Sequence, residues 1–295
     1  MVRPILLAVL VTSLMASNAK AAAPECNLTT RATSAQQVYD PFSSSDILLD
    51  VDISVTNNSE DKCTARYYLA PVNGTLALFK GIDRLTFRVE GPRGGGNLPE
   101  TYGPFVLHLD SKETESITVR TTVPARQLVP RGDYYGDLAI TAFGNGNQPI
   151  TIASPPVTLR VRVPGRVEMT ISGSISAPFP TGPSGGAAIS FGEAATGSKN
   201  QVYVHVWANG EVSISLDSEN RGRLKLLDSA TDGFIDYSAR FDGVPAPLSS
   251  RYSVRRAPPM TQAGGAYELA ITLGDTRSKF AGTYKDVITV TVDQN

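Results

Sequence analysis

Histidine and cysteine are scarce in this chain, which has two of each among 295 residues. Metal sites and nucleophilic catalysis need such residues to converge with carboxylates or hydroxyls, and the sequence singles out no such set. The run Gly94-Gly95-Gly96 is followed by Asn97-Leu98-Pro99, whereas a phosphate-binding loop requires Gly-Lys-Ser/Thr. We therefore expect a protein that is not an enzyme and that uses no cofactor and no metal.

Net charge and long helical patterns are also lacking. The 27 basic and 28 acidic residues nearly cancel to a formal charge of −1, and no dense Lys/Arg stripe is present, so we expect no nucleic-acid partner. Short runs rich in Val, Ile, Thr, Tyr and Phe take the place of 3.6-residue periodicity, and 26 glycines with 20 prolines supply turns. The composition predicts an all-β protein.

The amino terminus has the three parts of a secretory signal. An early Arg3 precedes an apolar stretch from Ile5 to Met15 and a small-residue end at Ala19-Lys20-Ala21, so we expect residues 1–22 to be a signal peptide. No later run is apolar over the roughly 18 residues that a membrane span needs. We therefore expect the mature protein to be secreted.

The two cysteines, Cys26 and Cys63, lie in the first half of the chain. In an oxidising compartment such a pair is expected to form one disulfide, worth about 3 to 4 kcal/mol on the chain-entropy model. The alternative is two unpaired buried thiols.

The most informative feature is an internal repeat at a fixed offset of 150 residues (282 − 132). It matches Gly132, Tyr134, Leu138, Ile140 and Ala142 to Gly282, Tyr284, Ile288, Val290 and Val292. Both segments read as Gly-x-Tyr followed by an alternating strand, the pattern of the corner before the penultimate strand of a Greek-key sandwich, where the tyrosine hydroxyl bonds its own turn. We therefore expect two immunoglobulin-like Greek-key β-sandwiches in tandem, in domains 23–164 and 165–295.

The expected strands differ between the two domains at their ends. In the first domain we expect Cys26–Arg31, Ile47–Val55, Cys63–Leu69, Leu85–Val89, Phe105–Leu109, Leu138–Phe143 and Val157–Val163. In the second we expect Arg166–Ile175, Ile189–Gly192, Val202–Trp207, Glu211–Leu216 and Val287–Val292. Val157–Val163 has no counterpart after Val292, so the second domain is expected to lack its last strand and to accept one from a partner.

The residues expected to line the donor-strand groove of that incomplete domain are Met169, Ile171, Ile288, Val290 and Val292. The extension ahead of the first expected strand is only a few residues, so we expect the chain to accept a strand without donating one.

With these motifs the chain resembles subunits of archaic chaperone-usher pili, the group that includes spore coat protein U domains. The cues are Cys26, Tyr39-Asp40-Pro41 and Cys63 in the first domain, and Ile189-Ser190-Phe191-Gly192, Ser218-Glu219-Asn220, Ile235-Asp236-Tyr237, Asp242-Gly243 and Ala281-Gly282-Thr283-Tyr284 in the second. The chain departs from the pattern because the second domain lacks the pilin disulfide and Phe191-Gly192 is the only copy of its motif.

The resemblance implies three assembly partners: a periplasmic chaperone that lends a strand, an outer-membrane usher, and the next pilus subunit, whose donor strand replaces the chaperone's. A two-domain member looks like a tip adhesin, secreted through the periplasm to the pilus tip on the bacterial cell surface, with a surface or glycan receptor of unknown identity. For receptor binding we expect the loop from Gly144 to Pro156, at the pole away from the linker, with Asn145, Asn147, Gln148, Ile150 and Ile152 as contacts.

Other interpretations stay open at this point. The chain could be a secreted two-domain carbohydrate-binding protein with self-complete domains, or a hydrolase that uses His108 or His205. Asp50 and Asp52 share a strand face and could hold a cation, although a solvated face is the simpler interpretation. Arg131-Gly132-Asp133 spells an integrin-binding tripeptide, but the repeat explains its glycine by the corner.

Overall fold

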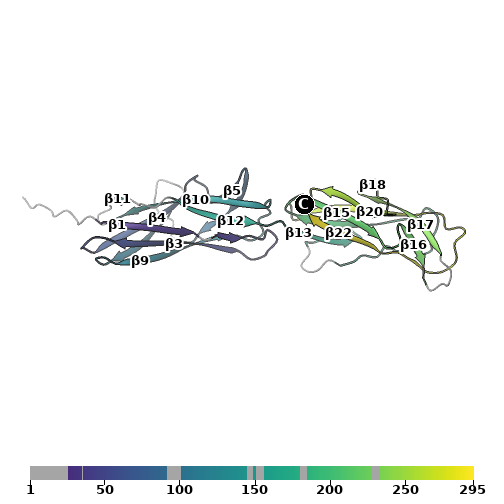
Figure 1. The fold of residues 1–295 in the computed structure, drawn as a ribbon, viewed down its shortest axis with the longest axis horizontal. Helices are drawn as coiled ribbons and strands as arrows, with labels where there is room; N and C mark the ends of the chain where they lie inside the picture. Colours follow the sequence, from purple (N-terminus) through teal and green to yellow (C-terminus); the bar gives the residue numbers. More distant parts are fainter. Residues whose placement is uncertain are drawn as a thin grey trace, which may run out of the picture.

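The computed structural model describes residues 26–34, 36–91, 101–144, 149–150, 156–179, 185–227 and 233–295. Over these residues the chain forms strands, turns and irregular segments without a helix. Two β-sandwiches lie end to end along one long axis (Figure 1). Each has a separate cluster of buried apolar residues. The all-β, immunoglobulin-like fold class is as the sequence predicts.

The first sandwich is built from twelve strands in two sheets. One sheet has the order β1-β3-β9-β7, and the other has the order β2-β12-β10-β4-β8, with β11 and β5 also paired to β10 and β6 paired to β5. The strands are β1 (Leu28–Ser34), β2 (Gln36–Val38), β3 (Ile47–Asn57), β4 (Cys63–Pro71), β5 (Ala77–Lys80), β6 (Asp83–Thr86), β7 (Arg88–Val89), β8 (Tyr102–Leu109), β9 (Thr114–Val123), β10 (Gly132–Phe143), β11 (Pro149–Ile150) and β12 (Val157–Val163).

The second sandwich has the sheet orders β13-β14-β20-β17-β16-β21 and β19-β15-β22, with β18 paired to β17. Its strands are β13 (Val167–Ser172), β14 (Lys199–Ala208), β15 (Val212–Ser218), β16 (Arg223–Leu226), β17 (Phe234–Phe241), β18 (Val244–Pro245), β19 (Tyr252–Arg256), β20 (Gly265–Leu273), β21 (Tyr284–Lys285) and β22 (Ile288–Gln294).

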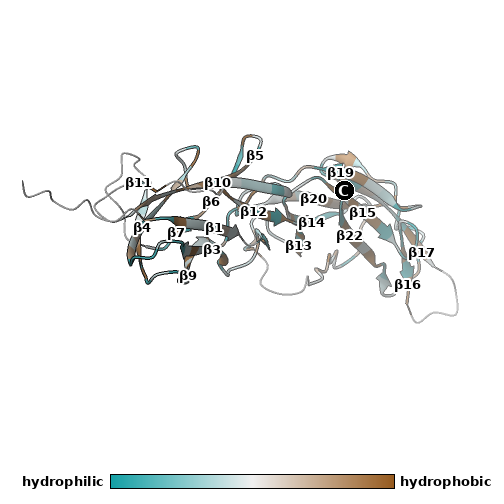
Figure 2. Ribbon diagram, turned by 60° about the vertical axis from the view of Figure 1, so that its left-hand side comes forward, coloured by the Kyte–Doolittle hydropathy of each residue, from teal (hydrophilic) through white to brown (hydrophobic). Residues whose placement is uncertain are grey.

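Alternation of apolar and polar residues explains why these segments form sandwich strands. In β3 the side chains of Leu49, Val51, Ile53 and Val55 are 0 % exposed, while the residues between them face outward. Because successive side chains of a strand point to opposite faces, one face of the sheet enters the core. Figure 2 shows the same change between apolar and polar stretches along strands of both sandwiches.

The predicted tyrosine corner is present in both sandwiches. The hydroxyl of Tyr134 donates to the backbone oxygen of Pro130 at 2.8 Å, and the hydroxyl of Tyr284 donates to that of Phe280 at 2.9 Å. Gly132 and Gly282 begin the two corners with φ angles of 140° and 153°, a region that glycine adopts without strain. The predicted internal repeat is therefore visible as equivalent local structure.

Two strand predictions are wrong. Leu85–Val89 is not one strand, because the chain crosses between sheets at the buried Phe87: β6 pairs with β5 in one sheet and β7 with β9 in the other. Ile189–Gly192 is not a strand; Ile189 and Phe191 still pack against the second core, but the segment has no ladder partner within the described residues.

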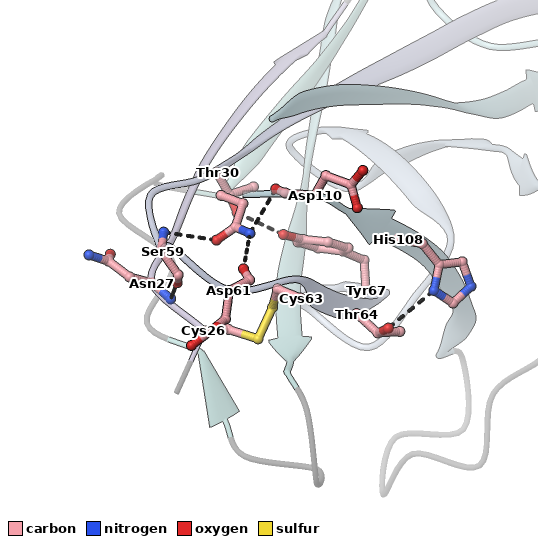
Figure 3. The surroundings of a disulfide bond; sticks show 11 residues. Cys26, Asn27, Thr30, Ser59, Asp61, Cys63, Thr64, Tyr67, His108 and Asp110 are labelled. Carbon is pink, nitrogen blue, oxygen red and sulfur yellow. Dashed lines mark hydrogen bonds between the residues drawn. A yellow bond between two sulfur atoms is a disulfide. The ribbon is translucent and has the colours of Figure 1, made fainter. Parts of the chain in front are cut away.

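The disulfide between Cys26 and Cys63 is formed, with 5.7 Å between the Cα atoms (Figure 3). It joins Cys26, two residues before β1, to the first residue of β4, at the pole of the first sandwich opposite the second. Beside it, the amide of the buried Asn57 donates to the backbone oxygens of Asp61 and Asp110 at 2.8 and 2.9 Å. The bond and the amide together fasten the loops at this pole.

The two sandwiches meet at a short junction around residues 164–166. Asp40 of the first sandwich pairs with Arg166, with 3.1 Å between Oδ2 and Nε. Phe42 lies against Phe179 with ring centroids 5.3 Å apart, and Phe179 lies against the buried Trp207 at 5.5 Å. The Tyr39-Asp40-Pro41 motif therefore belongs to both regions: Tyr39 is part of the first core, and Asp40 is part of the contact between the sandwiches.

The predicted signal peptide, residues 1–22, lies outside the described residues. Within the described parts of the chain, no helix has the length and apolar character needed to cross a membrane.

Candidate functional site

The strand β22 is bordered on one side only. It pairs with β15 over seven positions, from Ser218↔Ile288 to Val212↔Gln294. Its counterpart in the first sandwich, β10, pairs with β4 on one side and with β12 on the other. Within the described residues β22 has no second strand partner. One row of its backbone hydrogen-bonding groups is therefore left without a ladder.

The strand β13 presents a second unpaired edge beside the first. It pairs with β14 from Val167↔Ala208 to Ser172↔Tyr203 and is the end strand of its sheet. β13 and β22 are spatial neighbours, yet no ladder joins them in the described structure. The two sheets of the second sandwich thus meet along a line where neither edge is paired.

We call this line the β13–β22 seam and define it by the inward-facing side chains of the two strands: Val167, Met169, Ile171, Ile288, Val290 and Val292. All six are only partly buried and pack against the second core. Of the three equivalents in β10, Leu138 and Ala142 are each 1 % exposed, while Ile140 is partly buried like Val290. The seam therefore leaves apolar surface accessible where the first sandwich covers it.

In the first sandwich, β12 and β11 pair with β10 on the side opposite β4. At the offset of 150 residues, the stretch paired with β12 corresponds to 282–288, so Leu138 is its one residue with an equivalent, Ile288, in β22. Strand β12 pairs with β10 over seven positions, from Gly132↔Val163 to Leu138↔Val157. Every second side chain of β12 enters the core, and these four are 0 to 4 % exposed: Val157, Leu159, Val161 and Val163. An alternating strand with four large apolar side chains is the element that the seam lacks.

The structure brings the five predicted groove residues together. Met169 and Ile171 come from β13, and Ile288, Val290 and Val292 from β22, all packing on one core. Sequence reasoning missed Val167 on the same face of β13. It assigned Ile189 and Phe191 to a strand, whereas they pack against the same core from an irregular segment. Their alternation with Ser190 was the available signal for their burial.

Asp286 holds the end of β22 that lies away from the linker. One carboxylate oxygen, Oδ2, accepts hydrogen bonds from the hydroxyls of Ser218 and Tyr237, at 2.7 and 2.5 Å, and Oδ1 accepts one from the backbone N–H of Asn220 at 3.0 Å. Burial, with the hydrogen bond to Asp286, raises the pKa of Tyr237. A cavity of about 450 Å³ next to this end is lined mainly by polar side chains, including Ser218. The start of β22 is thus fixed independently of any strand partner.

Neither histidine has the surroundings of a catalytic base. The Nε2 atom of the buried His205 lies 2.9 Å from the backbone oxygen of Ser174 and 3.1 Å from the hydroxyl of Ser172. A carbonyl oxygen can only accept, so Nε2 carries the proton and is not a base toward Ser172. His108 contacts the hydroxyl of Thr64 at 3.1 Å on an exposed face.

The other candidate residues have local partners. Asp52 accepts a hydrogen bond from the hydroxyl of Thr118 at 2.7 Å, and Asp50 lies 3.7 Å from the guanidinium of Arg120. The described residues contain no cluster of three or more His, Cys, Asp or Glu able to hold a metal ion. In the Arg-Gly-Asp tripeptide, the backbone N–H of Arg131 donates to Asn209 and Asp133 pairs with Arg160.

The predicted receptor loop is described only in part. Ile150 pairs with Ala142 as part of β11, is partly buried and packs against the first core. Asn145, Asn147, Gln148 and Ile152 lie outside the described residues. β11 lies at the pole of the first sandwich farthest from the second (Figure 1).

No protein-family model matches the chain, and no curated protein matches its sequence. Solved structures do match. A chain of the CsuC–CsuE chaperone–tip adhesion subunit pre-assembly complex from the archaic chaperone-usher Csu pili of Acinetobacter baumannii is 14 % identical, with a TM-score of 0.42, covering 90 % of this chain and 99 % of that one.

Two further matches come from structures of fimbrial proteins. A chain of a chaperone–tip adhesin complex of CFA/I fimbriae is 11 % identical, with a TM-score of 0.36, covering 89 % of this chain and 96 % of that one. AggA, the major subunit of aggregative adherence fimbriae type I from Escherichia coli, is 12 % identical, with a TM-score of 0.27, covering 48 % of this chain and 98 % of that one. At these identities and scores the matches carry no functional argument, which rests on the seam.

Proposed function

We propose that this chain is a non-catalytic subunit of a chaperone-usher pilus, of the tip adhesin type. Its second sandwich accepts a strand at the β13–β22 seam, first from a periplasmic chaperone and then from the next pilus subunit at the usher in the outer membrane. Its first sandwich, at the pilus tip on the cell surface, contacts a surface or glycan receptor.

The observation that carries this proposal is the contrast between β10 and β22. The two strands are related by the repeat, but β10 pairs with β4 on one side and with β12 and β11 on the other, whereas within the described residues β22 pairs with β15 alone. An unpaired edge beside partly exposed apolar side chains is the arrangement to which an extended peptide adds as a strand. Main-chain hydrogen bonds supply the affinity, and alternate side chains supply the specificity.

The energy available at the seam is sufficient for a stable assembly. A donor strand with the apolar alternation of β12 would bury four large side chains, at about 1.5 to 3 kcal/mol each, in addition to its ladder of hydrogen bonds. Binding to the folded state alone also raises the apparent stability of the second sandwich by mass action. The unoccupied chain should therefore be less stable and more prone to aggregate than the occupied one.

A peptide with the alternation of β12 tests the proposal directly. We expect the purified chain to bind such a peptide and the thermal transition of its second sandwich to rise, with the first unchanged. The matched control is the same peptide with aspartate at its two central apolar positions. Equal behaviour with both peptides, or no effect of either, would show that the second sandwich needs no partner strand, as in a self-complete carbohydrate-binding protein.

The adhesive role of the first sandwich rests on the loop between Gly144 and Pro156. Replacing residues 145–148 and 151–152 with Gly and Ser, while retaining β11, should abolish attachment of the assembled pilus to its surface. The control replaces the exposed residues 193–195, in the loop between β13 and β14 on the second sandwich, with Gly and Ser. Unchanged attachment of the first variant would remove this loop from the receptor site.

A further inference from the structure

The linker end of the β13–β22 seam is closed by one buried amide. The side chain of Asn209, which is 2 % exposed, accepts hydrogen bonds at Oδ1 from the backbone N–H of Arg166 at 2.8 Å and from Nε2 of Gln294 at 3.0 Å. Its Nδ2 donates to the backbone oxygen of Pro164 at 2.8 Å. One side chain therefore joins the linker, the residue before β13 and the last residue of β22.

Gln294 fills the space at this closed end. Its side-chain amide lies so close to Gly165 that a Cβ atom there would collide with it. The residue beyond β22, Asn295, continues the pairing, because its backbone N–H donates to the oxygen of Glu211 at 3.1 Å and its side chain accepts from the hydroxyl of Ser213 at 2.9 Å. A strand that binds in the seam along β22 would reach the contact between Gln294 and Gly165 at the linker end.

Arg131 of the first sandwich reaches across the junction to the same place. Its backbone N–H donates to the backbone oxygen of Asn209 at 3.2 Å, and its guanidinium donates to the backbone oxygen of Asn295. Arg131 directly precedes β10 at the tyrosine corner, so its position is set by the first core. The first sandwich thus holds the end of a strand that belongs to the second.

We propose that Arg131, Asn209 and Gln294 form a clamp that closes the linker end of the seam and makes the first sandwich a positioning element for β22. Arg131 is its positioning residue: it fixes the end of β22 whether or not the seam is occupied. The clamp also sets where an incoming extended peptide stops. This last consequence rests on the proposed function, whereas the fixation of β22 does not.

Hydrogen exchange of the full-length chain without a peptide tests the clamp. In Arg131→Ala we expect amide exchange over residues 290–295 to accelerate about tenfold, with the first core unchanged. Arg131→Lys keeps the charge but loses the forked donor geometry, so intermediate exchange is expected. The control is Arg255→Ala, an exposed arginine on β19, which lies in the same sheet and is separated from β22 by β15. Exchange equal in Arg131→Ala and the control would overturn the clamp.

A second measurement uses peptides of two lengths based on β12. One ends opposite Val292, and the other continues by three residues past Gln294. In the natural chain we expect equal affinity for both, because the clamp blocks the extension. In a variant with Arg131→Ala and Gln294→Ala the longer peptide should bind at least fivefold more tightly. A longer peptide that already binds more tightly to the natural chain would overturn the clamp. Failure of both peptides to bind would refute strand acceptance, while the exchange measurement still judges the clamp.

Discussion

Tyr134 and Tyr284 lie 150 residues apart (284 − 134) and make the same hydrogen bond. Each hydroxyl donates to the backbone oxygen of the residue four positions earlier, at 2.8 and 2.9 Å. The strands at the two corners differ in their pairing. β10 is paired on both sides, whereas β22 is paired on one side within the described residues. The pair therefore aligns the two sandwiches and identifies a position at which their strand pairing differs.

Removing the hydroxyl of Tyr134 should destabilise the first sandwich. Tyr134→Phe keeps the buried ring but leaves the oxygen of Pro130 without its donor, which costs about 1 kcal/mol. Tyr284→Phe should cost less, because its hydrogen bond is exposed to water. Urea unfolding followed separately for each sandwich measures both values. A larger loss from Tyr284→Phe would contradict this explanation.

Alkaline pH should weaken the first sandwich through the same residue. Burial raises the pKa of Tyr134 from its ordinary value of 10.0 to about 12. Below pH 10 both the folded and the unfolded chain keep the proton, so the stabilisation is fully present. Between pH 10 and 12 the unfolded chain loses the proton more readily than the folded chain, so the free energy of unfolding falls as the pH rises through this range. Urea unfolding at pH 9, 10.5 and 11.5 should show a shallower fall in Tyr134→Phe than in the natural chain; parallel slopes would refute the assignment.

Opening the disulfide should affect the first sandwich alone. Cys26→Ser with Cys63→Ser removes the crosslink over 37 residues and is expected to lower the free energy of unfolding of the first sandwich by about 3 to 4 kcal/mol. The second sandwich has no cysteine and should unfold as before. Differential scanning calorimetry resolves the two transitions, and an equal shift in both would show that the sandwiches unfold as one unit.

A charge on the inner face of β22 should abolish strand acceptance. Val290→Asp places a carboxylate among the apolar side chains of the seam, where an unpaired charge is strongly unfavourable. Thr289→Asp is the matched control, because Thr289 is exposed on the outer face of the same strand. We expect a loss of peptide affinity of at least 100-fold for the first variant and less than threefold for the second. Circular dichroism checks that both remain folded.

Loss of affinity in both β22 variants to the same degree would mean that the peptide does not bind through the inner face. Val290→Thr provides a milder test of the same face, since it keeps the shape of the side chain and adds one hydroxyl. Its affinity should fall between those of the natural chain and Val290→Asp.

Periodicity and the repeat were enough to predict the β-sandwich class, the tyrosine corners and the strand Val157–Val163, and the even cysteine pair was enough to predict the disulfide. They failed where a local pattern has two structural solutions. Phe87 continues the alternation of Leu85 yet marks a crossing between sheets, and Ile189 with Phe191 alternates like a strand without a ladder. Side-chain burial alone cannot distinguish these cases, because both keep apolar groups in the core.

The junction could not be predicted, because its contacts join residues that are distant in sequence and ordinary in type. Arg131 read as part of a tripeptide motif, and nothing near Asn209 indicated that its amide would join the linker to β22. The short strands β16 and β19 were likewise missed, since each carries two basic residues among few apolar ones. Such features depend on which segments the fold brings together.

Under the proposed function the protein would be held between a surface and a fibre, and the direct passage of β12 into the linker then has a mechanical consequence. Tension entering at residue 164 pulls β12 along its own axis, so its seven paired positions with β10 are loaded in parallel and must shear together. Force applied across the ladder would instead break them one after another. We expect the first sandwich to resist stretching through the linker at higher force than a pull across β12, and single-molecule extension from the two attachment geometries would reveal equal forces if this is wrong.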